Sequence, residues 1–258
     1  MKCVKTYHFP IDPEKYPWFD KRTFPVVTRH RLEDKIQFAC LRGFPSDEGL
    51  TGDISPMKSN ALLLNLEETI DMFVNHFKLG KVLWPVYPTL LAKNFKELVD
   101  ICAREKLYLY DFWGFVPGAK RSDKDIWGEY TIPPEADACL QEKLGDHFLG
   151  YDNGEQDGRF VHSRARLQST IIDSREAQYE VFQRYFEKLN DSMLNHTVTL
   201  ASLTFVHYFA REGNTIMLGA ETAQALPCNN MWYSFIRGAA EQYGLLYYGN
   251  GLRLEQMG

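Results

Sequence analysis

The sequence predicts an α/β fold built around a parallel sheet, and two observations lead to this prediction. Short apolar stretches alternate along the chain with longer amphipathic segments. No glycine-rich phosphate turn follows any of these apolar stretches. The alternation is typical of βαβ units, in which a helix connects two parallel strands. The missing turn argues against a nucleotide-binding open sheet.

Each candidate strand is a short run of apolar, β-branched or aromatic residues with turn-forming or polar residues at its ends. Pro85 weakens the far end of the second strand, because proline donates no ladder hydrogen bond. A stretch rich in glycine, proline and acids, 43–56, is predicted to be a loop. The six candidate strands are 36–41, 82–87, 107–113, 147–151, 215–220 and 245–249.

The segments between these strands carry helical patterns. Asn65 and Glu68 have the spacing of a capping box, which predicts a helix that begins there and ends before Gly80. Apolar residues from Phe95 to Cys102 recur three and four positions apart, as on one face of a helix. Similar patterns predict four further helices, around 134–144, 175–190, 203–210 and 231–243.

A closed barrel of parallel strands and helices needs eight strands, and six are found. The alternatives are an open doubly wound sheet and an interrupted barrel. Since no phosphate turn is present, we favour an incomplete TIM-type (β/α) barrel of about six strand–helix units over residues 35–258. Residues 1–34 are rich in proline and aromatic residues and show no sustained period, so they are predicted to form an extended arm.

Composition excludes several classes of protein. A net charge of −5 and a pI near 5.8 argue against nucleic acid as a partner, because phosphate binding needs a basic surface. No apolar stretch approaches membrane-spanning length, so no membrane partner is predicted. Five scattered cysteines indicate thiols in a reducing compartment, with the cytoplasm as the default. We predict no metal and no cofactor.

Acidic residues follow several predicted strands, and two of them are predicted to be catalytic. Glu155 follows the fourth strand and Glu221 follows the fifth. Asp111 ends the third strand and is expected to open onto the same face, because the carboxyl ends of parallel strands meet at one edge. Paired carboxylates are typical of glycosidic bond hydrolysis. The alternatives are a plain solvated loop or a calcium-like oxygen cluster around Glu155, and for Glu221 a structural contact with Arg237 or with a backbone N–H.

Further strand-end residues are predicted to bind the substrate. Acids, amides and an arginine offer the donors and acceptors that sugar hydroxyls need, and aromatic rings offer flat faces for sugar C–H groups. Aromatic residues make up 14% of the chain, which mildly favours a sugar site, although most such rings simply fill a core. The predicted binding residues are Asp111, Asp152, Asn153, Arg159 and Gln224, together with the aromatic residues Trp84, Tyr87 and Trp113.

Three segments carry a resemblance to a known group: 219–227 (GAETAQALP), 235–244 (FIRGAAEQYG) and 248–250 (YGN). They resemble stretches of large, mostly uncharacterised glycosidase-like proteins of the (β/α)8-barrel superfamily, and this chain looks like a C-terminally truncated member. The resemblance is clearest over 147–250. It implies a barrel fold, carbohydrate as the substrate class and strand-end acids as the catalytic candidates.

The sequence therefore predicts a glycoside hydrolase-like protein. The alternative is a noncatalytic carbohydrate-binding or interaction protein derived from a truncated barrel. An interrupted barrel leaves open strand edges, and the apolar run 245–248 is strongly β-prone. Self-association through this edge is the expected consequence unless the N-terminal arm covers it.

Overall fold

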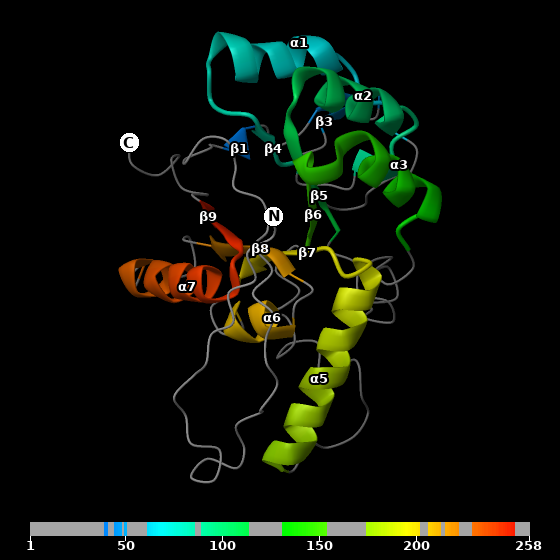
Figure 1. Cartoon of the computed structure of the whole chain (residues 1–258). Helices are drawn as coiled ribbons and strands as arrows, with labels where there is room; N and C mark the ends of the chain where they lie inside the picture. The colour runs from blue at the N-terminus through cyan, green and yellow to red at the C-terminus, as the bar shows by residue number, and fades with distance from the viewer. Residues whose placement is uncertain are drawn as a thin grey trace.

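A computed structural model describes residues 39–40, 44–47, 49–50, 61–85, 89–113, 131–153, 174–201, 206–212, 215–221 and 229–250. Over these residues the chain alternates strands and helices, which confirms the α/β class (Figure 1). The arm predicted at 1–34 lies outside the described residues. None of the described helices combines the length and the apolar character that crossing a membrane requires.

Seven of the nine described strands form one parallel sheet, in the order β1-β4-β5-β6-β7-β8-β9. Each strand therefore lies beside the strand of this sheet that precedes it in the sequence. A doubly wound sheet would instead reverse its order partway. The strands are β1 (Ala39–Cys40), β4 (Val82–Leu83), β5 (Tyr108–Phe112), β6 (Phe148–Asp152), β7 (Thr197–Ala201), β8 (Thr215–Glu221) and β9 (Leu246–Asn250).

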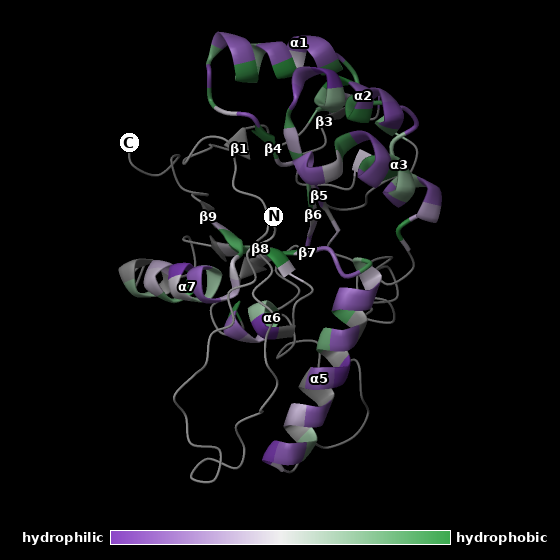
Figure 2. Cartoon of the chain, in the orientation of Figure 1, coloured by the Kyte–Doolittle hydropathy of each residue, from purple (hydrophilic) through white to green (hydrophobic). Residues whose placement is uncertain are grey.

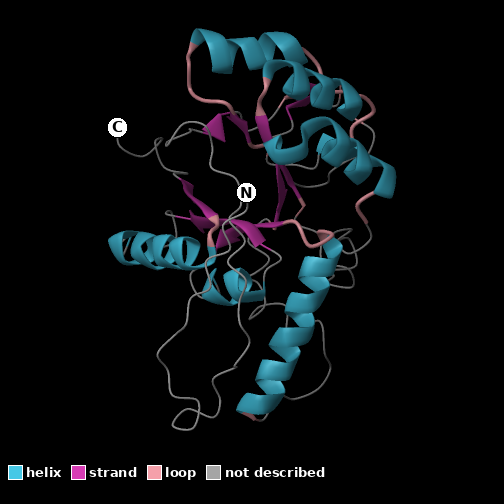
Figure 3. Cartoon of the chain, viewed as in Figure 1, coloured by secondary structure: helices cyan, strands magenta, loops and turns pink. Residues whose placement is uncertain are grey.

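The six α-helices of the described residues lie outside the curled sheet, with α1 to α3 on one side and α5 to α7 on the other (Figures 1 and 3). Hydrophilic and hydrophobic bands alternate along α2 and α5, as in helices that cover a core (Figure 2). Their bounds are α1 (Leu66–Asp71), α2 (Phe95–Glu105), α3 (Pro134–Leu144), α5 (Arg175–Ser192), α6 (Val206–Glu212) and α7 (Asn229–Tyr243). Shorter helical turns are η1 (Met72–His76), η2 (Thr89–Leu91) and η3 (Gly145–His147).

All six α-helices pack against the same face of the sheet, which we call the outer face. Buried side chains from every one of them join a single core cluster with strand residues such as Leu83, Leu109 and Leu218. Helices on one face and strands added in sequence order are the winding of a (β/α) barrel. The structure thus has a curled, barrel-like sheet of seven strands, and no pairing between β1 and β9 is found among the described residues.

The opposite face, which we call the inner face, has its own smaller cluster. Its buried members are Val82, Tyr108, Tyr110, Leu149, Val198 and Met217, and Trp84 and Leu246 pack against them. Along β4 and β5, residues of this cluster alternate with residues of the outer core, as the two-residue period of a strand requires. The inner face is therefore largely apolar.

Six of the seven strands lie where the sequence predicts strands, and β7 is the exception. Two of its residues, Thr197 and Thr199, are fully buried although they are polar. The predicted loop 43–56 also contains a two-stranded antiparallel hairpin, formed by β2 (Pro45–Ser46) and β3 (Gly49–Leu50). Strand β7 is polar and depends on tertiary neighbours, whereas β2 and β3 have two residues each and are too short to give a strand pattern.

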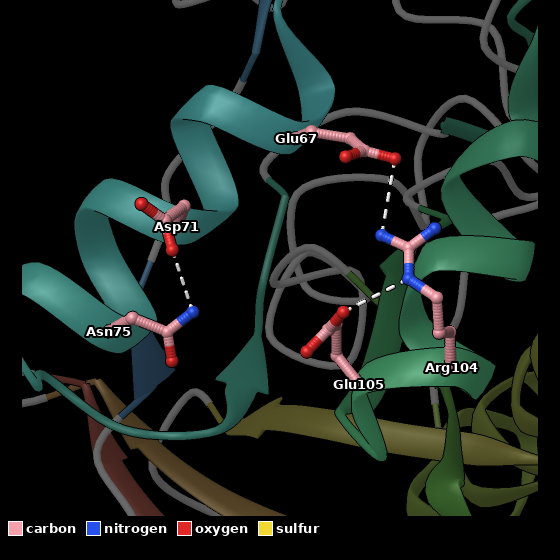
Figure 4. Close-up of polar contacts among 5 residues, drawn as sticks. All are labelled: Glu67, Asp71, Asn75, Arg104 and Glu105. Carbon is pink, nitrogen blue, oxygen red and sulfur yellow. Dashed lines mark hydrogen bonds and ion pairs between the residues drawn. The ribbon is translucent and has the colours of Figure 1, made fainter.

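The capping box predicted at Asn65 is wrong. Asn65 has a left-handed backbone (φ 52°), and its side chain makes no cap hydrogen bond. Instead the first turn of α1 is bound to α2 by an ion pair, since Arg104 Nη2 lies 3.1 Å from Glu67 Oε1 (Figure 4). Within α2, Arg104 Nε also lies 3.0 Å from Glu105 Oε1 (Figure 4). These groups are exposed, so the ion pairs contribute little stability.

Candidate functional site

The polar part of the inner face depends on a β-bulge in β6. Leu109 pairs with Phe148, but Tyr110 pairs with Gly150, so Leu149 is an extra residue in β6. Gly150 has φ +116°, and a Cβ placed there would lie 2.4 Å from the carbonyl oxygen of His196. Only glycine fits this position without strain or displacement of the backbone. A bulge of this kind reverses which side chains face inward beyond it.

The bulge places the carboxylate of Asp152 on the inner face. Asp152 pairs in register with Val198, a member of the inner cluster, and it is fully buried. Its Oδ2 accepts a hydrogen bond of 2.7 Å from the indole Nε1–H of Trp84. Trp84 directly follows β4 and Asp152 ends β6, so both lie at the carboxyl edge of the parallel sheet. In (β/α) barrels this edge carries the functional groups.

Tyr110 lies between these two residues, on the central strand of the three. Its ring stacks on Trp84 with a centroid distance of 5.9 Å and an interplanar angle of 13°. Burial, reinforced by the negative charge of Asp152, raises the pKa of the Tyr110 hydroxyl well above its ordinary value. Tyr110 therefore remains neutral at physiological pH beside an acidic side chain. The three residues form a compact group, which we call the inner-edge group.

Asp111 does not join this group, although it was expected to open onto the same face as the other acids. It is the residue after Tyr110 in β5 and lies on the outer face. Its Oδ1 accepts from the backbone N–H and the hydroxyl of Thr89, and its Oδ2 accepts from the N–H of Leu90, each at 3.0 Å. The carboxylate therefore holds the first turn of η2 against the sheet.

Trp113 and Asn153, which were predicted to bind the substrate, are both fully buried. Trp113 belongs to the outer core cluster with the helices, and its backbone N–H donates to the carbonyl of Asp152 at 2.7 Å. The backbone N–H of Asn153 donates to the carbonyl of Val198 at 3.0 Å. Of the predicted binding residues, the structure brings Trp84 and Asp152 together.

The other predicted residues lie beyond what the structure describes. Glu155, Tyr87, Arg159 and Gln224 fall outside the described residues. For Glu221 the backbone alone is described: it is the last residue of β8 and pairs in register with Asn250. Position 221 is thus at the same carboxyl edge of the sheet as the inner-edge group, and the Glu155–Glu221 pair stays a prediction.

Sequence reasoning missed Tyr110 and Gly150 as contributors to this site. The strand pattern around Tyr110 gives no indication that its ring stacks on a residue of the neighbouring strand. A glycine inside a strand pattern is a signal for a bulge, and Gly150 carried that signal. Within the described ranges, no cluster of three or more His, Cys, Asp or Glu side chains is arranged to hold a metal ion.

Comparisons of the chain with protein-family models, with curated proteins and with solved structures find no match. The class of the protein therefore follows from its fold alone, an α/β protein with a curled, barrel-like parallel sheet. The resemblance to glycosidase-like barrel proteins stays an expectation from the sequence.

Proposed function

We propose that this chain is a glycoside hydrolase-like protein that acts on a carbohydrate at the carboxyl edge of its sheet. The observation that supports the proposal is the hydrogen bond from Trp84 to Asp152 at that edge. It places a buried carboxylate beside two stacked aromatic rings. Carboxylates accept hydrogen bonds from sugar hydroxyls, and aromatic rings pack against sugar C–H groups.

In this proposal Glu155 and Glu221 supply the chemistry. One carboxyl group protonates the leaving oxygen, and the other acts as a nucleophile or activates water. Both positions follow strands of the same parallel sheet, and position 221 ends β8 at the carboxyl edge. Asp152 is fully buried, so its proposed role is to hold Trp84 at this edge of the sheet rather than to contact the substrate.

The alternative is a noncatalytic carbohydrate-binding protein with the same site. The hydrogen bond between Trp84 and the buried Asp152 fits both functions, because it holds the partly exposed indole at the carboxyl edge in either case. The two functions differ in whether a glycosidic bond is cleaved, so one experiment separates them.

The test is a screen of the purified chain against α- and β-4-nitrophenyl glycosides and natural polysaccharides. Glu155→Gln and Glu221→Gln are each expected to lower kcat by roughly 10²- to 10⁴-fold, the range for loss of a general acid or base. Glu187→Gln changes an exposed acid of α5 in the same way and is expected to leave kcat unchanged. Activity that persists in both Glu155→Gln and Glu221→Gln contradicts the catalytic assignment. Saturable glycan binding without product release favours the binding protein.

A further inference from the structure

We infer that the chain forms a symmetric dimer through the exposed side of α1 and η1, with a second copy of itself as the partner. The outward side chains of residues 67–79, at the periphery of the molecule (Figure 1), are called the α1–η1 surface here. Dimerisation through this surface does not depend on the proposed function. It also differs from the self-association that the sequence predicts, which involves the open strand edge at 245–248.

Three large apolar side chains are exposed within the last eight residues of this surface. The exposed fractions are 41% for Met72, 55% for Phe77 and 43% for Leu79. Leu66 and Ile70 of the same helix are instead buried in the outer core cluster. A single exposed apolar residue is ordinary, but a group of them indicates an interaction site. Methionine and aromatic residues are also enriched in protein interfaces.

The π-helical turn η1 brings Met72 and Phe77 closer to the same side of the segment. The N–H of Phe77 donates to the carbonyl of Met72 at 2.9 Å, and this bond spans one residue more than in an α-helix. In a regular α-helix, residues five apart point about 140° away from each other, since each residue turns by about 100°. The wider turn reduces this angle. It therefore joins two apolar side chains that an α-helix would separate.

The exposed ring of Phe77 is held in place by two neighbouring rings. Edge-to-face contacts join it to Phe73, at 6.5 Å between ring centroids, and to His76, at 4.9 Å. Phe73 itself packs against the outer core cluster. A side chain that is already ordered loses less entropy when it binds a partner. Phe77 therefore has the properties of an aromatic interface anchor.

The charges along the segment indicate that the partner is a second copy. The first part of the segment carries Glu67, Glu68 and Asp71, whereas its end carries His76 and Lys78. A twofold axis perpendicular to the segment sets the two copies antiparallel, so the acidic part of each lies beside the basic end of the other. A parallel arrangement would bring like charges together, which opposes association.

Two of the three acids are engaged within the chain. Arg104 Nη2 lies 3.1 Å from Glu67 Oε1, and Asn75 Nδ2 donates to Asp71 Oδ1 at 2.8 Å (Figure 4). The third acid, Glu68, is exposed. We therefore assign Glu68 to the contact between the copies.

The spacing of the residues fits this contact. Glu68 and Lys78 are both exposed, and each is five residues from Phe73. An axis close to this midpoint brings Glu68 of each copy beside Lys78 of the other. Met72 and Phe77 of both copies then lie between the two ion pairs. An apolar centre with a charged rim is the usual anatomy of a protein interface.

The first arm of the test is sedimentation velocity of the full chain at about 1 to 100 μM, a range that covers micromolar dimers. The wild type is expected to shift from monomer to dimer as the concentration rises. Phe77→Ser removes the anchor from both copies and is expected to raise the dimer Kd by about 10-fold or more. Phe235→Ser is the matched control, because Phe235 on α7 is 50% exposed, and it is expected to leave the Kd unchanged. A wild type that stays monomeric throughout overturns the inference.

The second arm tests the antiparallel arrangement by charge reversal. Glu68→Lys and Lys78→Glu each place like charges together twice in the dimer, so each is expected to raise the Kd by about 10-fold. In a mixture of these two variants, positions 68 and 78 carry opposite charges again wherever they meet. Heterodimers are therefore expected to form with a Kd close to that of the wild type. A mixture that associates no better than the single variants overturns the inference.

Two further outcomes would place the contact elsewhere. A dimer that is lost in Phe235→Ser, or in Tyr247→Lys on the edge strand β9, but persists in Phe77→Ser overturns the inference. Each substituted side chain is exposed, so the melting temperature at a concentration below the dimer Kd is expected to change little. This measurement separates loss of the dimer from loss of the fold.

Discussion

Gly150 determines which way the carboxylate of Asp152 points. Without the extra residue in β6, the alternation that starts at Phe148 on the outer face would turn residue 152 toward the helices. With it, Tyr151 faces the helices, where its hydroxyl donates to Asp137 Oδ1 at 2.7 Å, and Asp152 faces inward. The bulge at Gly150 therefore places the Tyr151 hydroxyl on the outer face and the Asp152 carboxylate on the inner face.

Gly150→Ala is expected to destabilise the protein by about 2 to 5 kcal/mol, from a strained positive φ together with a clash. The added Cβ would lie 2.4 Å from the carbonyl oxygen of His196, whose partner across the strands is the N–H of Tyr151. Urea denaturation measures the change in the free energy of unfolding. Gly238→Ala is the matched control, because a Cβ at this position in α7 meets nothing within 4 Å. It is expected to be neutral or to stabilise by up to about 1 kcal/mol.

At the scale of whole elements, strand and helix positions follow closely from the sequence, and the exceptions have physical reasons. In β7 the buried Thr197 hydroxyl donates to Asn190 Oδ1, and the hydroxyl oxygen of Thr199 accepts from the N–H of Gly219 at 3.3 Å. These partners lie on α5 and β8. Burial of the two threonine hydroxyls would be unfavourable without them, so β7 is stable only when those elements pack against it. No local pattern contains that information.

For the candidate site, the sequence predicts the location but not the direction of the side chains. Its location at the carboxyl edge follows from the order of strands and helices, and Asp152 was found as a strand-end acid. The direction of each side chain was not predictable, because it depends on a single inserted residue. Asp111 is the penultimate residue of β5 and Asp152 is the last residue of the neighbouring β6, yet one holds η2 and the other holds Trp84. The sequence offers no sign of this difference.

Helix capping gives a testable contrast between two elements. Ser174 caps α5, and its hydroxyl oxygen accepts from the N–H of Ala177 at 3.1 Å, whereas Asn65 before α1 makes no such bond. Ser174→Ala is expected to reduce the free energy of unfolding by about 1 kcal/mol, a typical loss for an N-cap. Asn65→Gly suits the left-handed backbone and is expected to cause no loss. Thermal unfolding of both variants checks this, and equal losses would contradict it.

For the molecule as a whole, the inner and outer faces each bury a tyrosine whose hydroxyl resists ionisation. Burial and the charge of Asp152 raise the pKa of Tyr110, and burial and the hydrogen bond to Asp137 raise the pKa of Tyr151. The unfolded chain releases these protons near pH 10, while the folded protein retains them. The stabilisation is therefore complete below about pH 10 and is lost as the pH rises above it.

Above pH 10, the free energy of unfolding is expected to fall by about 1.4 kcal/mol per pH unit for each of these tyrosines. Tyr110→Phe removes one of the two contributions, so its stability is expected to fall less steeply than that of the wild type. Urea denaturation between pH 9 and pH 11 measures both slopes. Tyr179→Phe, which removes a hydroxyl from a half-exposed side chain on α5, is the control. Parallel slopes for Tyr110→Phe and the wild type would contradict the prediction.

The order of the strands also has a consequence for how the protein is made on the ribosome. Every strand of the parallel sheet after β1 pairs with the strand of this sheet that was synthesised before it. A growing chain can thus add one strand and one covering helix at a time, and no strand from β4 to β9 must wait for a distant later segment to supply its first partner. Unpaired β-prone segments are a source of aggregation during synthesis. Each newly made strand from β4 onward finds its first partner already present, so the sequential order itself shortens the period in which that strand is unpaired.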